Sequence, residues 1–145
     1  MSEQSIMALI EERLGERVGD YVIPPPVFES MRGEFLDFDT EAGWLRARFP
    51  VLKAQLNPYG SMQGGMVAAA IDNTLGPLSM LVAPPNVTRR LSVKYSRQAR
   101  REMGAIVVKA WFLEQDGRWL RFRAEARDPD DRILARANAL HWILD

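Results

Sequence analysis

The fold is decided by the stretch Asn57-Pro-Tyr-Gly-Ser-Met-Gln63-Gly64-Gly65-Met-Val-Ala-Ala-Ala-Ile-Asp72-Asn73. It starts as a polar loop, passes through a pair of glycines and continues as an apolar run over residues 66–82. This run is rich in good helix formers and lacks the polar face that a surface helix needs. We therefore expect a loop that leads into one helix, covered by other elements on every side.

Asp72 is the one ionisable residue of that apolar run. An unpaired carboxylate is costly to bury, so a structural role alone explains this residue poorly. The alternative is an ion pair with one of the many arginines of the chain. We interpret Asp72 as a functional residue.

The composition is that of a globular protein. The 145 residues, 47% hydrophobic and 26% charged, suit a single domain over residues 1–145. Nineteen basic and nineteen acidic residues give a net charge of zero, so no overall field recruits nucleic acid or an anionic membrane. The absence of cysteine excludes a disulfide framework, a thiolate nucleophile and a zinc-thiolate site. No group of residues has the spacing of metal ligands.

The sequence favours a cytoplasmic protein. Its amino-terminal residues lack the basic start and apolar core of a signal peptide, and the lack of cysteine permits a reducing compartment. The apolar run over residues 66–82 is nearly as long as a membrane span. It holds Asp72, Asn73, Gly76 and Pro77 in its middle, so we predict no membrane helix.

The first thirty residues predict a helix and a connector. Apolar residues recur at helical spacing over residues 5–13, within an amino-terminal helical region of residues 1–20. Pro24-Pro25-Pro26 then forbids regular structure and predicts an extended, proline-rich connector over residues 21–30.

The rest of the chain predicts strands around the long helix. Two precede it, at residues 31–38 and 44–49, and four follow it, at residues 88–95, 105–115, 118–128 and 133–143. Turn signals at Asp116-Gly117 and Asp128-Pro-Asp-Asp131 favour a meander of the last four strands. Small side chains share one face of the last strand, at Ala135, Ala137 and Ala139, where a helix can approach closely. We predict an α+β fold in which a curved antiparallel sheet wraps around the central helix.

This element order and the motif at the helix start resemble the hot-dog fold, and within it the phenylacetate-pathway (PaaI-like) acyl-CoA thioesterases. Those proteins show an Asn, then His-Gly-Gly, then a helix that carries an Asp. A Thr or Ser later opens a strand that ends Tyr-x-x-Pro-Ala. Asn57, Gly64-Gly65, Asp72 and Thr88 match this pattern in order. The resemblance covers the chain from about residue 31 to its end.

Two positions depart from the family pattern. Gln63 stands where His is common, and Gln98 stands where Pro is common. The first change keeps a side chain that forms hydrogen bonds but removes one that titrates.

The motif fits the hydrolysis of a thioester. Gly64 and Gly65 open the helix, where free backbone N–H groups and the helix dipole favour the negative charge of an oxyanion. Asp72 lies eight residues after Gly64, about 12 Å along a helix, so one substrate carbonyl does not easily touch both. The resemblance implies a homodimer in which Asp72 of one subunit faces the Asn57 and Gly64-Gly65 loop of the other. A dimer of dimers is the larger alternative.

The resemblance also implies the roles of the site residues. Asp72 is expected to act as base or nucleophile, Asn57 and Gln63 to orient water or thioester, and Gly64 to stabilise the oxyanion. The expected substrate contacts are Gly65, Asn73, Thr88, Arg89 and Arg90. The two arginines would bind the phosphates of coenzyme A, although a solvated strand edge explains them equally well. No cofactor is expected, because coenzyme A is part of the substrate, and no metal.

The expected activity is hydrolysis of a medium-chain or aromatic acyl-CoA. The alternative is a non-catalytic module of the same fold that binds acyl thioesters, which Gln63 favours. A hot-dog dehydratase uses a His with a carboxylate, and this loop has no His. His141, the only histidine, lies between Leu140 and Trp142 and is expected to be structural. Ser61 follows Gly60 directly, which is not the spacing of a nucleophile elbow.

Overall fold

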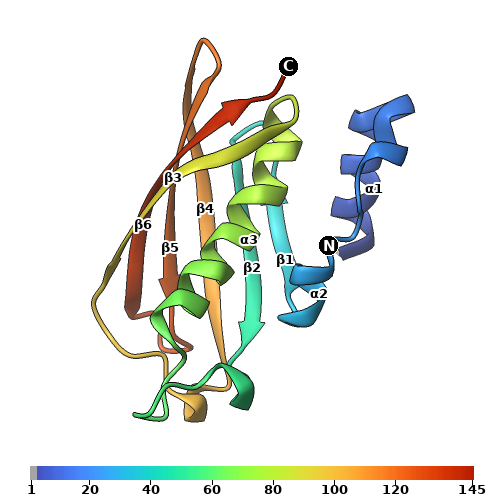
Figure 1. Cartoon of the computed structure of the whole chain (residues 1–145). Helices are drawn as coiled ribbons and strands as arrows, with labels where there is room; N and C mark the ends of the chain where they lie inside the picture. The colour runs from blue at the N-terminus through green and yellow to red at the C-terminus, as the bar shows by residue number, and fades with distance from the viewer. Residues whose placement is uncertain (1–2) are drawn as a thin grey trace.

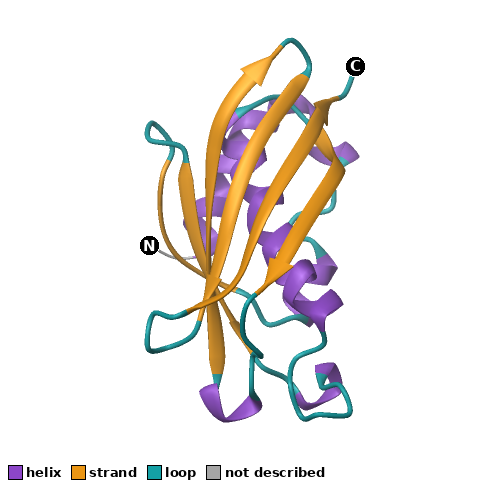
Figure 2. Cartoon of the chain, turned by 90° about the vertical axis from the view of Figure 1, so that its left-hand side faces the viewer, coloured by secondary structure: helices purple, strands orange, loops and turns teal. Residues whose placement is uncertain are grey.

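One sheet with helices on one of its faces makes up the structure (Figures 1 and 2). The computed structural model describes residues 3–145. The helices are α1 (Glu3–Leu14), α2 (Pro26–Ser30) and α3 (Gly64–Val82). The strands are β1 (Glu34–Asp39), β2 (Trp44–Pro50), β3 (Asn86–Tyr95), β4 (Ala105–Asp116), β5 (Trp119–Arg127) and β6 (Ile133–Ile143).

The predicted amino-terminal helical region contains α1, and a short 3-10 helix at Gly15–Asp20 continues it. Residues 1 and 2 of that region lie outside the described residues. The prediction of an extended connector over residues 21–30 is wrong in its second half, which forms α2. Pro26 is the first residue of α2. Proline is tolerated there because the first N–H of a helix has no partner within the helix.

The sheet has the strand order β1-β2-β4-β5-β6-β3, and neighbouring strands are antiparallel. The predicted meander is confirmed for β4, β5 and β6 but is wrong for β3, which pairs with β6. A tight turn joins hairpin neighbours, whereas residues 96–104 between β3 and β4 form a long link. This link is tied to the loop before α3, because Met62 N donates to Ala99 O (2.8 Å). The chain therefore crosses the end of the sheet before β4 begins.

Both predicted turns are present. The β4–β5 hairpin is closed by the pair Asp116 and Trp119, with Gly117 at a φ of 60° that suits glycine. In the β5–β6 turn, the Asp128 carboxylate accepts hydrogen bonds from the backbone N–H groups of Asp130 and Arg132, each at 2.9 Å. The Arg132 N–H is the largest cause that lowers the pKa of Asp128.

The inner face of α3 packs on the sheet through buried apolar residues. These are Val67, Ala70, Ile71, Leu75, Leu78 and Leu81. They share one apolar core with buried alanines of β5 and β6, which are Ala124, Ala126, Ala135, Ala137 and Ala139. The predicted dry face of β6 is therefore confirmed as buried, but the strand that α3 approaches most closely is β4 rather than β6.

The outer face of α3 is not fully covered by this chain. Gly65 is exposed, and Ala68, Ala69, Asp72 and Gly76 are half-buried. We expected other elements to cover this helix on every side. Within the single chain, only the face toward the sheet is fully covered. Among the described residues, α3 is also the one helix long and apolar enough to cross a membrane, yet 50% of that window is buried in the protein.

Candidate active site

Asp72 and Thr88 meet where α3 passes the start of β3. Thr88 Oγ1 lies 3.0 Å from Asp72 Oδ1, which confirms the expected proximity of these two residues. Asp72 is half-buried and Thr88 is exposed. The partner of the carboxylate is thus a hydroxyl rather than an arginine, which disfavours the ion-pair interpretation.

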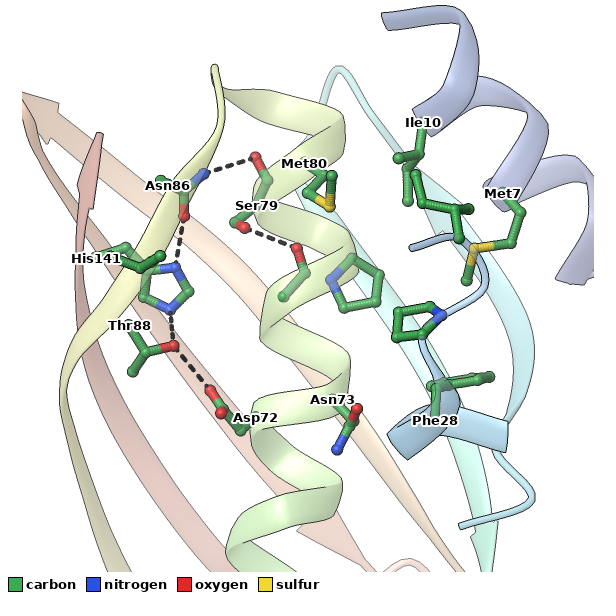
Figure 3. A pocket seen from close by; sticks show the side chains of 15 residues that line it. Met7, Ile10, Phe28, Asp72, Asn73, Ser79, Met80, Asn86, Thr88 and His141 are labelled. Atoms are coloured by element: carbon green, nitrogen blue, oxygen red, sulfur yellow. Dashed lines mark hydrogen bonds between the residues drawn. The ribbon is translucent and has the colours of Figure 1, made fainter. Parts of the chain in front are cut away.

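His141 of β6 extends this contact into a chain of polar side chains (Figure 3). Its Nε2 lies 3.3 Å from Thr88 Oγ1, and its Nδ1 lies 2.8 Å from Asn86 Oδ1. The ring is 1% exposed and packs against Phe122, with ring centroids 4.7 Å apart. Burial lowers the pKa of His141 below its usual value, and the Asp72 carboxylate opposes this shift.

A cavity of about 300 Å³ opens beside Asp72. Its polar groups belong to Asp72, Asn73, Ser79, Asn86, Thr88 and His141. Its apolar wall comes from α1, the proline-rich segment, α2 and α3, and includes Met7, Ile10, Ile23, Phe28, Pro77 and Met80. Figure 3 shows the hydrogen-bonded chain on one side of α3 and Met7, Ile10 and Phe28 on the other.

Arg13 holds α1 against the end of α3. Its guanidinium donates to the backbone oxygens of Met80 (2.9 Å) and Ala83 (3.5 Å), near the carboxyl end of α3. Basic side chains are favourable at that end of a helix. The contact fixes α1 as a wall of the cavity.

The start of α3 forms a second cluster, away from Asp72 in the same chain. Gln63 is the N-cap residue and makes no side-chain capping hydrogen bond. Gly64 and Gly65 supply N–H groups of the first turn, which a helix leaves without internal partners. Tyr95 donates its hydroxyl to the Gly64 carbonyl, and partial burial raises the pKa of Tyr95, which keeps that proton in place.

Asn57 shapes the loop that precedes Gln63. Its Oδ1 accepts hydrogen bonds from the backbone N–H groups of Tyr59 (3.0 Å) and Ser61 (3.1 Å). Asn57 and Gly64 line a shallow pocket with Tyr95. The structure therefore brings Asn57, Gly64 and the loop together, but not with Asp72 of the same chain.

Of the remaining predicted substrate contacts, Asn73 lies in the cavity, whereas Arg89 and Arg90 lie on the surface. Asn73 lines the cavity and donates its side-chain amide to Ala69 O (2.8 Å). Arg89 lies over the Trp142 ring at 5.6 Å, and Arg90 lines a groove with Arg121. Both arginines are exposed on β3 and lie outside the cavity that contains Asp72. Their role in substrate binding remains a prediction.

His141, Asn86 and Tyr95 were missed as site residues by sequence reasoning. His141 follows Ala135, Ala137 and Ala139 at intervals of two, so the alternation already puts it on the buried face of the strand. That signal was available for His141. Asn86 and Tyr95 sit at the two ends of β3, and no local pattern distinguishes them from ordinary strand termini.

No protein-family model matches the chain, and no curated protein matches its sequence. Solved structures match its fold. One is a candidate thioesterase related to phenylacetic acid degradation from Ralstonia eutropha JMP134, with a TM-score of 0.78 and 24% identity, covering 93% of this chain and 98% of that one. The PaaI protein from the phenylacetic acid degradation operon of E. coli has a TM-score of 0.79 and 11% identity, covering 97% and 96%. A Streptococcus mutans UA159 protein, solved bound to acetyl-CoA, has a TM-score of 0.70 and 17% identity, covering 76% and 86%.

These likenesses and the topology agree. The chain has the hot-dog fold, with a six-stranded antiparallel sheet and a long helix packed on it. PaaI-like proteins of phenylacetic acid degradation are among its structural neighbours.

Proposed function

We propose that this protein is an acyl-CoA thioesterase that hydrolyses the thioester of a medium-chain or aromatic acyl-CoA. The observation that carries the proposal is Asp72, a half-buried carboxylate beside a hydroxyl in a mainly apolar cavity. A carboxylate in such a place can take a proton from water, and an apolar cavity can hold an acyl group. Candidate-thioesterase and acetyl-CoA-bound neighbours support the substrate class.

The reaction needs a base and an oxyanion site. Asp72 removes a proton from the attacking water or attacks the carbonyl itself, and the thiolate of coenzyme A leaves with little help. The N–H groups of Gly64 and Gly65 stabilise the oxyanion, because they open α3 at the positive end of its dipole. Asn57 and Gln63 orient the water or the thioester.

A dimer brings the base Asp72 and the oxyanion site at Gly64 and Gly65 together. β3 ends the strand order, so one of its edges has no strand partner in the described chain, and long exposed edges favour pairing. Thr88 contacts Asp72 near one end of β3, and Tyr95 contacts Gly64 at the other. Antiparallel pairing of β3 with its own copy about the strand's middle therefore sets Asp72 opposite Gly64 of the partner subunit.

The size of the cavity supports a medium-chain or aromatic acyl group. The cavity of about 300 Å³ lies at the lower end of the range of roughly 300–1,000 Å³ that is typical of small-molecule pockets. A volume at that end of the range favours a group of the size of octanoyl or phenylacetyl over a long acyl chain. Arg89 and Arg90, exposed on β3, are available to the phosphates of coenzyme A at the same dimer edge.

Release of free thiol from short, medium, long and aromatic acyl-CoAs tests this function. We expect turnover, with medium-chain and phenylacetyl thioesters preferred over acetyl-CoA and long-chain thioesters. Binding of the same panel, measured by calorimetry, separates the alternative. Binding without thiol release from any member would replace the enzyme by a non-catalytic acyl-thioester module, in which Gln63 takes the place of the missing histidine.

The acyl preference should respond to Met80, a half-buried residue of the cavity wall. Met80→Trp should lower kcat/KM for octanoyl-CoA relative to acetyl-CoA by about tenfold or more, because single methylene groups already change specificity by that amount. Met80→Ala should move the preference toward longer chains. The backbone contact of Met80 with Arg13 is unaffected by either change. Equal ratios in all three proteins would show that the acyl group lies elsewhere.

A further inference from the structure

The orientation of the Asn86 amide determines where His141 carries its proton. Asn86 Nδ2 donates to two backbone oxygens, those of Pro84 (2.9 Å) and Ser79 (3.4 Å). Carbonyl oxygens accept only, so this end of the amide must be the NH₂ group. The other end, Oδ1, is then the acceptor at 2.8 Å from His141 Nδ1. The ring therefore donates from Nδ1, and in its neutral form Nε2 is an acceptor.

The Thr88 hydroxyl then has one hydrogen to donate but two acceptor atoms within reach. Its single hydroxyl hydrogen faces Asp72 Oδ1 at 3.0 Å and His141 Nε2 at 3.3 Å. With the carboxylate ionised and the ring neutral, one of these two contacts lacks a proton. One added proton completes both contacts. It can sit on Asp72, which then donates to Thr88, or on His141 Nε2, which then donates to Thr88.

We propose that Asp72, Thr88 and His141 form a proton relay that stores the proton taken from the attacking water. This inference rests on the proposed function, with Asp72 acting as base. Water loses a proton to Asp72 as its oxygen bonds to the thioester carbon. Asp72 passes a proton to Thr88 Oγ1, and Thr88 passes its own to His141 Nε2, which restores the carboxylate. When the C–S bond breaks and its electron pair goes to sulfur, the proton returns along the same path to the thiolate.

The surroundings of the ring suit a temporary proton store. From β3 it meets Asn86 and Thr88, which are uncharged. From β5 it meets Leu120 and Phe122, which are apolar. From α3 it is influenced by Asp72, whose negative charge favours the protonated ring, while burial disfavours it. The ring can thus gain and lose a proton during each cycle. Its position also explains how the site works with Gln63 in the loop, since the titrating imidazole comes from β6.

The first test observes the ring directly. His141 is the one histidine of the sequence, so ¹⁵N NMR of the untagged, His-labelled protein reports a single imidazole. We expect the neutral ring to carry its proton on Nδ1 and Asp72→Asn to move its titration to lower pH, because the charge that favours the cation is lost. A neutral ring protonated on Nε2, or a titration that Asp72→Asn leaves in place, would overturn the relay.

The second test uses the pH dependence of kcat/KM for the best acyl-CoA. In His141→Gln the fall of kcat/KM on the acid side of its pH profile should move to lower pH by about one unit or more. The reason is that the coupled pair of Asp72 and His141, which accepts the proton, has lost its histidine. We also expect kcat to fall at least about tenfold. A purely structural role of His141 would lower kcat without moving the acid side of the profile.

Thr88 variants separate the relay from a folding defect. Thr88→Val keeps a β-branched residue on an edge strand but removes the hydroxyl, so it should lower kcat about as much as His141→Gln. Thr88→Ser restores the hydroxyl and should recover most of kcat. Equal rates for Thr88→Val and the native protein would contradict the relay. If the native protein hydrolysed no acyl-CoA, the proposed function would be wrong. The NMR titration would still show whether protonation of His141 depends on Asp72.

Discussion

Replacing Asp72 by asparagine is expected to lower kcat for acyl-CoA hydrolysis by about 10²–10⁴-fold, the usual contribution of a general base. Asparagine has nearly the same size as aspartate, and its carbonyl oxygen can still accept a hydrogen bond from Thr88. It cannot take a proton from water or attack a carbonyl as a nucleophile. The KM should change little, because the cavity that holds the acyl group keeps its shape. Initial rates of thiol release over a range of acyl-CoA concentrations measure both constants.

A matched control removes a carboxylate outside the site. Asp116 is exposed in the β4–β5 hairpin, and Asp116→Asn removes the same charge there. We expect this variant to keep the native kcat. If Asp72→Asn and Asp116→Asn had the same kcat, Asp72 would be neither base nor nucleophile, and the chemistry would have to be assigned to another residue.

Gly64→Pro is expected to lower kcat by about 10²–10³-fold, the range found when an oxyanion-hole donor is lost. Gly64 is the first residue of α3, where proline is tolerated. Gln63 has φ −55° and ψ 141°, a conformation that a residue before proline readily adopts. The substitution therefore removes one N–H from the end of the helix while α3 remains intact.

Gly64→Ala is the control for the added carbon atoms. A Cβ at Gly64 would lie 3.3 Å from Tyr95 Cζ, so both variants push on the same ring. Alanine keeps the N–H, and its kcat should stay far above that of the proline variant. Equal losses in the two variants would assign the effect to crowding at Tyr95 and leave the oxyanion site unidentified.

Sequence patterns were sufficient for α1, α3 and the six strands, and for the core face of the sheet, but not for α2. Alternation in β6 put Ala135, Ala137 and Ala139 on one side, which is buried in the structure. The pairing of β3 with β6 could not be predicted in the same way, because strand order depends on the path of residues 96–104 rather than on any local period. Pro26 was misinterpreted because a proline that breaks a helix interior also suits a helix start.

In the candidate site too, one contact was predictable from the sequence and others depend on tertiary packing. Asp72 and Thr88 were predicted together, and they lie 3.0 Å apart. The contact of His141 with Thr88 depends on how α3 and β3 sit on the sheet, which alternation within β6 does not contain. The relation of Asp72 to Gly64 across two subunits is implied by the resemblance alone, because in the single chain the two residues line separate pockets.

The most direct test of a site shared between two subunits mixes two inactive proteins. Asp72→Asn and Gly64→Pro chains are unfolded together, refolded and assayed for thiol release. Random pairing makes half of the dimers mixed, and each mixed dimer has one of its two sites built from an intact Asp72 and an intact Gly64, so we expect about a quarter of the native activity. A mixture with no more activity than the two variants refolded separately would contradict the shared site.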